Sequence, residues 1–240
     1  MRRRGGHRHD QRVRHQTLIF DADDTLWENN VVFERVADRF VEWVAHPTLD
    51  AAGVRSALDA VEEANIVAHG YGSGVFLRSL AECYTQLTTR PIGTAERARL
   101  AEFGALFTAG QVELIAAVED VLTELRTRHE LLLMTKGDPV EQQRKIDNSG
   151  LADHFGGIEI VPVKDPATYR RVVFDRRLDP QVTWMIGNSP RSDILAARAA
   201  GLRAVFIPNA NTWAHEHADL DPADPGTLHL QQFADLRTHF

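Results

Sequence analysis

The sequence predicts an α/β fold, in which a doubly wound parallel sheet carries an inserted all-helical domain. A short apolar run at Leu18 to Phe20 is followed by about eighty residues whose apolar positions repeat with the period of a helix. From Val112 onward, helical and strand patterns alternate, as in a parallel sheet covered by helices on both faces. The expected division is a basic tail at 1–15, a core at 16–27 and 110–240, and a helical domain at 28–109.

The composition favours a globular protein whose charge is unevenly distributed. The chain has 240 residues, 43% of them hydrophobic, and a net charge of −7. Six arginines in the first 15 residues face one aspartate, so the tail carries +5 and the remainder −12. The tail has no apolar periodicity and is interpreted as a disordered extension. Because the acidic remainder would repel a phosphate backbone, we expect no nucleic-acid partner.

Nothing in the sequence indicates a membrane or secreted protein. No run approaches the ~20 apolar residues of a membrane span. The basic start is followed by an apolar run too short for a secretory signal. Cys83 is the only cysteine, so no intramolecular disulfide can form. A cytoplasmic location is therefore expected, while the oligomeric state is left open.

The first strand ends in a cluster of acids. Asp21, Asp23 and Asp24 directly follow the buried run and precede the apolar pair Leu26 and Trp27. Carboxylates this close cannot all ionise cheaply, so either their pKa values rise or a cation neutralises them. A hard ion such as Mg²⁺ suits carboxylate ligands. The alternative interpretation of the three acids is a turn that only caps the next helix. For Trp27, two interpretations are open: it lines a pocket, or it packs the hinge.

Four apolar stripes predict four amphipathic helices, which must pack together as a bundle to bury those faces. The stripes are Val32 or Phe33, Val36, Phe40, and Trp43 or Val44; Val54, Leu58, Val61 and Ala64; Phe76, Leu80, Cys83 or Tyr84, and Leu87; and Leu100, Phe103 and Phe107. A glycine cluster at 70–74 separates the second helix from the third. Tyr71 and Arg78 beside it are candidates for a substrate lid, against the simpler interpretation as a connector with a solvated arginine.

The second half of the chain predicts the remaining elements in alternation. An amphipathic helix at 114–125 comes first, and a last helix is expected near 231–238. Between them the patterns predict strands at 131–135, 158–163, 182–187 and 203–208, and helices at 140–148, 166–176 and 190–200.

Three strand-to-helix junctions share one pattern, a helix N-cap followed by proline at the first helical position. The pairs are Asp138–Pro139, Asp165–Pro166 and Ser189–Pro190. Parallel strands point the same way, so these helix N-termini and the end of the first strand should meet at one sheet edge. Free N–H groups and the helix dipole favour an anion there.

That edge would combine acids, lysines and hydroxyl groups. Two lysines and a threonine suggest a phosphate site, and the carboxylates beside them require a metal ion before a phosphate dianion can approach. The expected residues are Asp21, Asp23, Asp24, Thr135, Lys136, Lys164, Asn188, Ser189 and Asp193.

In chain order, DADDT at 21–25, Thr135, Lys164 and GNSPRSD at 187–193 resemble the four motifs of the haloacid dehalogenase (HAD) superfamily. The likeness is to its Mg²⁺-dependent phosphatases with a helical, C1-type cap inserted after the first motif. It implies a HAD-like Rossmannoid core whose first strand is central and neighbours the fourth. The implied activity is hydrolysis of the phosphate monoester of a small soluble metabolite.

The resemblance also implies roles for four catalytic residues. Asp21 would attack phosphorus to give an aspartyl-phosphate, and Asp23 would first protonate the leaving alcohol and then activate water. Thr135 would hold a phosphoryl oxygen. Lys164 would neutralise developing charge and orient Asp21.

The implied metal ligands for Mg²⁺ are Asp21, the Asp23 main-chain carbonyl, Asn188 and Asp193. The expected substrate contacts are Lys136, Gly137 and Ser189. Two positions depart from the family pattern: Asp24 stands where glycine is usual, and Asn188 where an acidic ligand is usual. Asn188 lowers the negative charge of the site by one, which leaves open how it shares the metal with Asp193.

Three other functions remain alternatives: a haloacid dehalogenase, which needs neither Asp23 nor Mg²⁺, a phosphomutase, and a non-catalytic phosphate-binding protein. The His-Glu-His run at 215–217 suggests zinc, but it has no partner cysteines and no recognised ligand spacing, and it is left out of the expected site.

Overall fold

The computed structural model describes residues 15–108 and 112–240, so nearly all of the predicted tail lies outside the described residues. Within them, six strands form one parallel sheet in the order β3-β2-β1-β4-β5-β6. Their bounds are β1 Thr17–Phe20, β2 Glu130–Lys136, β3 Gly157–Val161, β4 Thr183–Gly187, β5 Arg203–Phe206 and β6 Thr227–His229.

The first strand lies in the middle of the sheet. Phe20 is in register with Leu133 of β2 on one side and with Ile186 of β4 on the other. The strand order therefore reverses direction at β1, which is where open α/β sheets bind ligands. The prediction of a doubly wound parallel sheet with a central first strand next to the fourth is confirmed.

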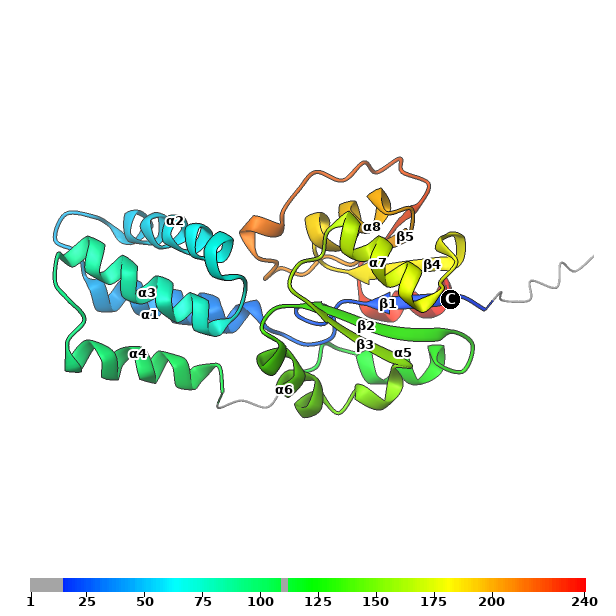
Figure 1. Ribbon diagram of the computed structural model, residues 1–240, viewed down its shortest axis with the longest axis horizontal. Coiled ribbons are helices and arrows are strands. Elements are labelled where there is room, and N and C mark those ends of the chain that lie inside the picture. Colours follow the sequence, from blue (N-terminus) through cyan, green and yellow to red (C-terminus); the bar gives the residue numbers. More distant parts are fainter. Residues whose placement is uncertain (1–14, 109–111) are drawn as a thin grey trace, which may run out of the picture.

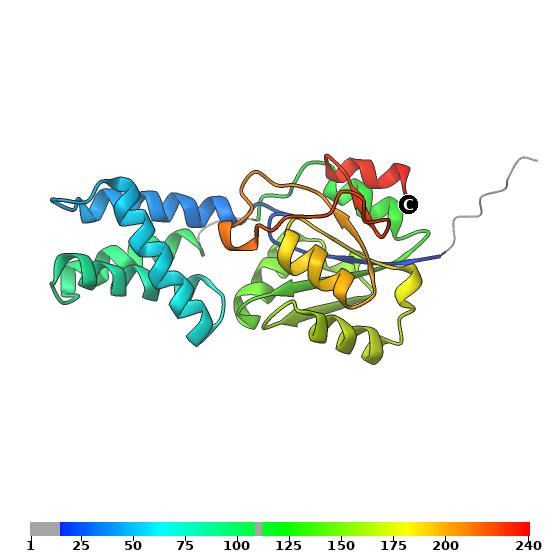
Figure 2. The same ribbon diagram turned by 90° about the horizontal axis from the view of Figure 1, so that it is seen from above.

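Helices cover both faces of the sheet (Figures 1 and 2). One face packs on α5 Val118–Leu125, α6 Pro139–Ser149 and the 3₁₀ helix η5 Phe233–Thr238, and the other on α7 Pro166–Arg176 and α8 Ala196–Ala199. The residues of β1 alternate between these layers, because successive strand side chains point to opposite faces. Leu18 and Phe20 join the first layer, and Ile19 joins the second.

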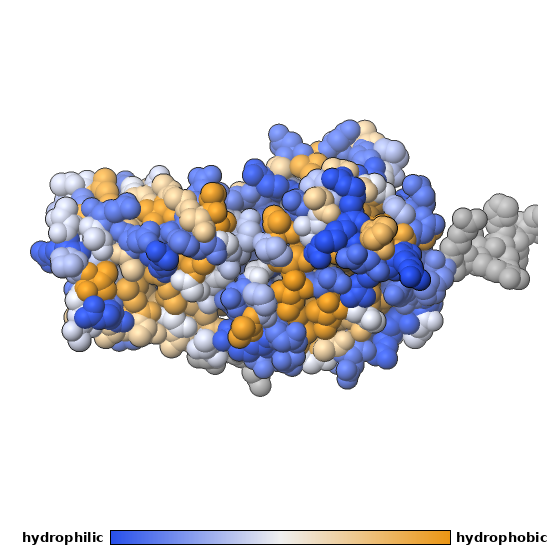
Figure 3. Space-filling model, in the orientation of Figure 1, coloured by the Kyte–Doolittle hydropathy of each residue, from blue (hydrophilic) through white to orange (hydrophobic). Residues whose placement is uncertain are grey.

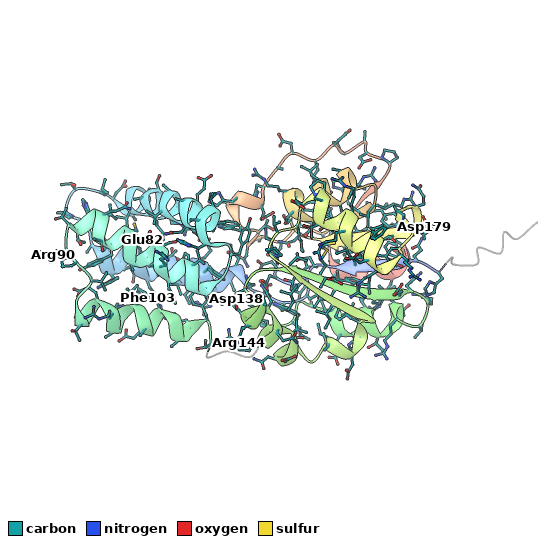
Figure 4. All side chains as sticks on the ribbon, in the orientation of Figure 1. Glu82, Arg90, Phe103, Asp138, Arg144 and Asp179 are labelled. Atoms are coloured by element: carbon teal, nitrogen blue, oxygen red, sulfur yellow. The ribbon has the colours of Figure 1, made fainter. Side chains whose placement is uncertain are left out.

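Four helices form a second unit between β1 and α5: α1 Asn30–Val44, α2 Ala51–His69, α3 Ser73–Thr88 and α4 Thr94–Leu106. This helical unit, residues 30–106, lies beside the carboxyl ends of the strands at one end of the molecule (Figure 1). It has an apolar cluster of its own, which includes Phe40, Leu58, Leu80 and Phe103. Phe103 is labelled inside this unit in Figure 4.

The predicted stripe of the second helix is wrong at its last member. Ala64 is exposed, whereas Glu62 and Asn65 are buried on the same helix. The apolar pattern could not show this, because the inner face of α2 includes two polar side chains.

Other element boundaries also differ from the prediction. The helix expected from Leu114 begins at Val118, because Leu114 pairs with Trp27 in an isolated β-bridge. The helix expected at 190–200 starts as a π-helix, η3 Pro190–Leu195, before α8, and the last helix expected near 231–238 is the 3₁₀ helix η5. Strand β6 was not predicted, since three partly exposed residues carry no clear period. The other short helices are η1 Ala152–His154, η2 Pro180–Val182 and η4 Ala214–Glu216.

Hydrophilic residues are spread over both the core and the helical unit on the face seen in Figure 3, with smaller hydrophobic areas between them. Among the described helices, none combines the length and the apolar character that a bilayer crossing requires.

Candidate active site

A cavity of about 140 Å³ lies between the carboxyl edge of the sheet and the helical unit. Its lining includes eight of the residues expected at this edge: Asp21, Asp23, Asp24, Thr135, Lys136, Asn188, Ser189 and Asp193. Lys164 is not in the lining but is hydrogen-bonded to Asp21 and Asp193. Gly137 also lies outside the lining, and its N–H donates to the carbonyl of Val161 at 3.1 Å. Residues far apart in the sequence therefore meet in one place.

Lys164 joins two buried carboxylates at the base of the cavity. Its Nζ donates to Asp21 Oδ1 and, at 2.8 Å, to Asp193 Oδ1. Burial disfavours the ammonium, but the carboxylates of Asp193 and Asp21 outweigh this and raise the pKa of Lys164 above its ordinary value. Burial and the Asp21 charge raise the pKa of Asp193 to about 7. Lys164 therefore keeps its positive charge beside Asp21.

The second oxygen of Asp21 is held by a residue to which the sequence analysis gave no role. Thr25 Oγ1 lies 2.8 Å from Asp21 Oδ2 and 3.1 Å from Asn188 Oδ1. The Asn188 side chain donates through Nδ2 to Thr212 Oγ1 at 2.8 Å, which turns its carbonyl oxygen toward Thr25. The sequence feature that could have indicated a role for Thr25 is its position directly after the acidic run.

Asp193 organises the loop that follows β4. Its Oδ2 accepts a hydrogen bond from the backbone N–H of Ser189 at 3.0 Å, and the residue is fully buried. A Cβ on Gly187 would lie 2.1 Å from the same oxygen. Glycine is therefore required at position 187 for the carboxylate to pack against the end of the strand.

The oxygen atoms at this edge fit Mg²⁺ in chemical kind. They are the carboxylates of Asp21 and Asp193 and the amide oxygen of Asn188, and Mg²⁺ is usually held by one or two carboxylates together with water and substrate phosphate. Within residues 15–108 and 112–240, no three His, Cys, Asp or Glu side chains form a metal-binding group. The ligand set described here has only two carboxylates, because its third oxygen donor is the side-chain amide of Asn188.

Asp23 is surrounded by hydrogen-bond donors. It accepts from Trp27 Nε1 at 2.7 Å, from Gln142 Nε2 at 2.9 Å and from Lys145 Nζ at 2.9 Å. Burial would raise its pKa, but Lys145 and the other donors leave the pKa below its usual value. Gln142 and Lys145 were not predicted. Their spacing on one face of a helix that starts at the site was the only signal.

Asp24 confirms the capping alternative for one acid of the cluster. Its Oδ1 accepts from the backbone N–H groups of Asn29 and Asn30, at 2.9 and 3.0 Å, where α1 begins. Its φ of 61° is the left-handed conformation that favours glycine. Burial raises the pKa of this carboxyl to about 7.

Glu216, from the run first considered for zinc, is part of the site. It forms an ion pair with Lys136 and accepts a hydrogen bond from Ser189 Oγ. Burial acts against ionisation, yet Lys136 and the hydroxyl lower the pKa of Glu216 to about 2. Lys136 Nζ also lies 4.5 Å from the ring centre of Tyr71. Tyr71, a candidate for the substrate lid, therefore reaches the cavity. Arg78 instead forms an exposed pair with Glu82.

All three lysines of the chain gather here. Lys136 and Lys145 line the cavity, and Lys164 lies beneath it. Seven acids line the same space: Asp21, Asp23, Asp24, Glu62, Glu141, Asp193 and Glu216. Acidic groups thus outnumber the ammonium groups, and the cavity favours bound cations.

The helical unit closes the cavity from the opposite side. Its apolar contribution comes from Phe33, Ile66, Val75 and Phe76. Ser73 at the start of α3 donates through N and Oγ to Glu141 of α6, at 2.9 and 2.8 Å. Figure 4 labels Asp138, just before α6, and Arg144 on α6, where the core meets the helical unit.

Comparisons with known proteins agree with this geometry. A family model described as haloacid dehalogenase-like hydrolase matches residues 15–201. A phosphoserine phosphatase of Thermus thermophilus is 28% identical over 93% of this chain and 97% of its own. The crystal structure of a haloacid dehalogenase-like family hydrolase from Xanthomonas campestris covers 94% of both chains, with 31% identity and a TM-score of 0.80. A 2-haloacid dehalogenase of Pseudomonas syringae covers 93% of this chain and 97% of its own, with a TM-score of 0.62 and 18% identity, and shares the fold.

Proposed function

Because this chain belongs to the haloacid dehalogenase-like hydrolase family, we propose that it hydrolyses the phosphate monoester of a small metabolite with the help of Mg²⁺. The observation that carries this proposal is the second carboxylate, Asp23, which lines the same cavity as Asp21. A displacement by Asp21 alone would not need it, whereas ester hydrolysis needs a group that moves protons. The named activity of the Thermus relative adds phosphoserine to the substrates worth testing.

In the first step, one carboxylate oxygen of Asp21 attacks phosphorus. The new bond joins Asp21 to the phosphoryl group, the bond from phosphorus to the ester oxygen breaks, and the leaving oxygen takes a proton from Asp23. Lys164 keeps Asp21 ionised and oriented, and Thr135 in the cavity lining binds a phosphoryl oxygen.

In the second step, water attacks the phosphorus of the aspartyl-phosphate. Asp23, now ionised, accepts the proton from water, and the bond between phosphorus and Asp21 breaks to release inorganic phosphate. The hydrogen bonds from Trp27, Gln142 and Lys145 stabilise the ionised form of Asp23 that this step requires. Its protonated form in the first step requires a looser pair with Lys145.

Mg²⁺, held by Asp21 and Asn188 or Asp193, would neutralise charge on the phosphoryl group and lower the repulsion between it and the nucleophile. The helical unit would act as the cap that covers the bound substrate. A cavity of about 140 Å³ suits a small substrate, since a void of roughly 150 Å³ holds a molecule the size of benzene.

A haloacid dehalogenase is the second candidate. The observation in its favour is that Asp23 is held in an ion pair with Lys145, which disfavours its proton-donating form. In that reaction Asp21 would displace halide from carbon, and Asp23 would remain a spectator.

The test is an assay of the wild type and Asp21→Asn on an aryl phosphate, with and without Mg²⁺, followed by a panel of phosphorylated metabolites. Mg²⁺-dependent phosphate release that Asp21→Asn abolishes supports the proposal. Metal-independent halide release from a 2-haloacid favours the dehalogenase. Transfer of phosphate within a sugar phosphate favours a mutase, and tight phosphate binding without turnover favours a non-catalytic protein.

A further inference from the structure

Glu62 is a buried carboxylate in the cap wall of the cavity that the proposed chemistry leaves unused. It lies in the middle of α2 and is 9% exposed, and it lines the cavity together with Ile66 one turn later. Residues four apart lie on the same face of a helix, so both side chains face the same space.

No hydrogen-bond donor within the described residues satisfies this carboxylate. Burial, with the charge of Asp59, raises the pKa of Glu62 to about 7, and no hydrogen bond contributes to lowering it. Asn65, a buried polar residue on the same helix, differs sharply. Its side chain donates to Ser79 Oγ at 3.2 Å and to Glu82 Oε2 at 2.8 Å. Because a buried charge without a partner is unfavourable, the ionised form of the Glu62 carboxylate is destabilised in this position.

The cations around Glu62 are already paired. Arg55, the cation that acts on Glu62, forms a two-pronged ion pair with Glu34 at 2.7 and 3.0 Å, and a further one with Asp59 at 2.8 Å. On the core side, Lys136 pairs with Glu216 and Lys145 pairs with Asp23. Among the cations of residues 15–108 and 112–240 that lie near Glu62, each already has a partner, so a ligand that carries a cation would complete the pair.

The surroundings of Glu62 define the shape of such a ligand. The side of the cavity formed by the helical unit is largely apolar, with contributions from Phe33, Ile66, Val75 and Phe76. Glu62 is the acidic side chain on that side of the cavity. The phosphate-handling residues lie on the opposite, core side of the same cavity. A substrate that spans the cavity would place its phosphate at Asp21 and the far end of its alcohol at Glu62.

We propose that Glu62 binds a primary ammonium group on the alcohol part of the substrate, so that the enzyme selects aminoalkyl phosphate monoesters. This inference rests on the proposed phosphatase activity and adds the substrate class. An ammonium group would pair with the carboxylate across the cavity, satisfy its hydrogen-bond capacity and reduce the acidic excess of the site.

The experiment compares pairs of phosphate esters that differ only in whether the alcohol carries an ammonium or a hydroxyl group. O-phosphoserine is paired with 3-phosphoglycerate, and phosphoethanolamine with 2-hydroxyethyl phosphate. An aryl phosphate reports activity that needs no ammonium. The wild type, Glu62→Gln and Glu63→Gln are assayed with each ester. Glu63 is the matched control, because it is the next residue on α2 and is exposed.

We expect the wild type to prefer the ammonium member of each pair by at least about 10-fold in kcat/KM. Glu62→Gln should lower kcat/KM for that member by about 10- to 100-fold, the range for a hydrogen bond to a charged group. The hydroxyl members and the aryl phosphate should change by less than about threefold, and Glu63→Gln should resemble the wild type with every ester.

Three results would overturn the inference. A wild type that hydrolyses the aryl phosphate without preferring the ammonium esters leaves the phosphatase standing and removes the role of Glu62. An equal loss of both members of each pair in a folded Glu62→Gln shows a structural role. A wild type that hydrolyses none of the esters removes the proposed function and the inference together. If Glu62→Gln does not fold, the preference of the wild type decides.

Discussion

Replacing Lys164 by Met tests the buried charge cluster at the base of the site. The Lys164 side chain is 1% exposed, and its partners Asp21 and Asp193 are 9% and 1% exposed. Met fills much of the same volume but removes the cation, so two carboxylates remain buried near each other without compensation. Loss of one partner of a buried pair costs about 3–5 kcal/mol. For a chain of this size, that lowers Tm by roughly 6–20 °C, at about 2–4 °C per kcal/mol.

The assay is thermal and denaturant unfolding of Lys164→Met at neutral pH, with Arg78→Met as the control. Arg78 belongs to an exposed ion pair with Glu82, so its loss should change stability by less than about 0.5 kcal/mol. Added Mg²⁺ should restore part of the stability of Lys164→Met, because it supplies a cation to the same carboxylates.

The pH dependence gives a second check on the same variant. Lys164 opposes the effect of burial on the pKa of Asp193, which is already raised to about 7, so without the ammonium, protonation of this carboxyl adds to the stability of the folded variant as the pH falls. The difference in the free energy of unfolding between Lys164→Met and the wild type should therefore narrow toward pH 4. A Lys164→Met protein within about 1 kcal/mol of the wild type at pH 7 would refute the reasoning about this cluster.

Three further predictions concern the neighbouring residues. Lys145→Gln removes the ion pair that lowers the pKa of Asp23. For an alkyl phosphate, the descending limb of the profile of kcat/KM against pH should therefore move to higher pH. A limb that does not move argues against Asp23 as the general acid. In isothermal titration, Asp193→Ala should weaken Mg²⁺ binding more than Asn188→Ala, because a carboxylate attracts the ion more strongly than an amide; the reverse order means that the ligands are misassigned. Asp24→Asn keeps an acceptor for the start of α1 but removes a carboxyl whose pKa rises from 3.8 to about 7 on folding, so its stability relative to the wild type should increase from pH 4 to pH 7 in denaturant titrations; a constant difference contradicts the raised pKa.

The parallel sheet was predictable because its signals are local. Each buried strand is a short apolar run, and the paired N-cap and proline mark the starts of α6, α7 and η3 in the sequence itself. The structure shows the side chains of Asp138, Asp165 and Ser189 as caps, each accepting a hydrogen bond from the backbone N–H three residues later. Parallel topology then brings the loops to one edge.

The residues that were missed act through contacts between distant segments. Glu216 reaches the site from a segment with no clear period, and its partner Lys136 lies 80 positions away. Lys145 reaches Asp23 across 122 positions. Glu62 lies beside the predicted apolar stripe of α2, which did not include it. Periodicity identifies which face of a helix is buried, but it cannot identify a polar residue that faces a cavity formed with another unit.

The sequence also could not divide the labour among the three acids of the first loop. Spacing places Asp21, Asp23 and Asp24 together, but their roles depend on which donors each side chain meets. Lys164 and Thr25 hold Asp21, and Trp27, Gln142 and Lys145 hold Asp23. Asp24 holds the start of α1, in a left-handed backbone conformation that aspartate adopts only occasionally.

A phosphoryl group caught on Asp21 would be decisive for the proposed chemistry. The enzyme is quenched during turnover of an aryl phosphate with Mg²⁺, reduced with borohydride to convert an acyl phosphate into homoserine, and mapped by mass spectrometry. We expect reduction at residue 21 and none at Asp23 or Asp24. Turnover that leaves residue 21 unmodified, or modification at another carboxylate, would show that Asp21 is not the nucleophile.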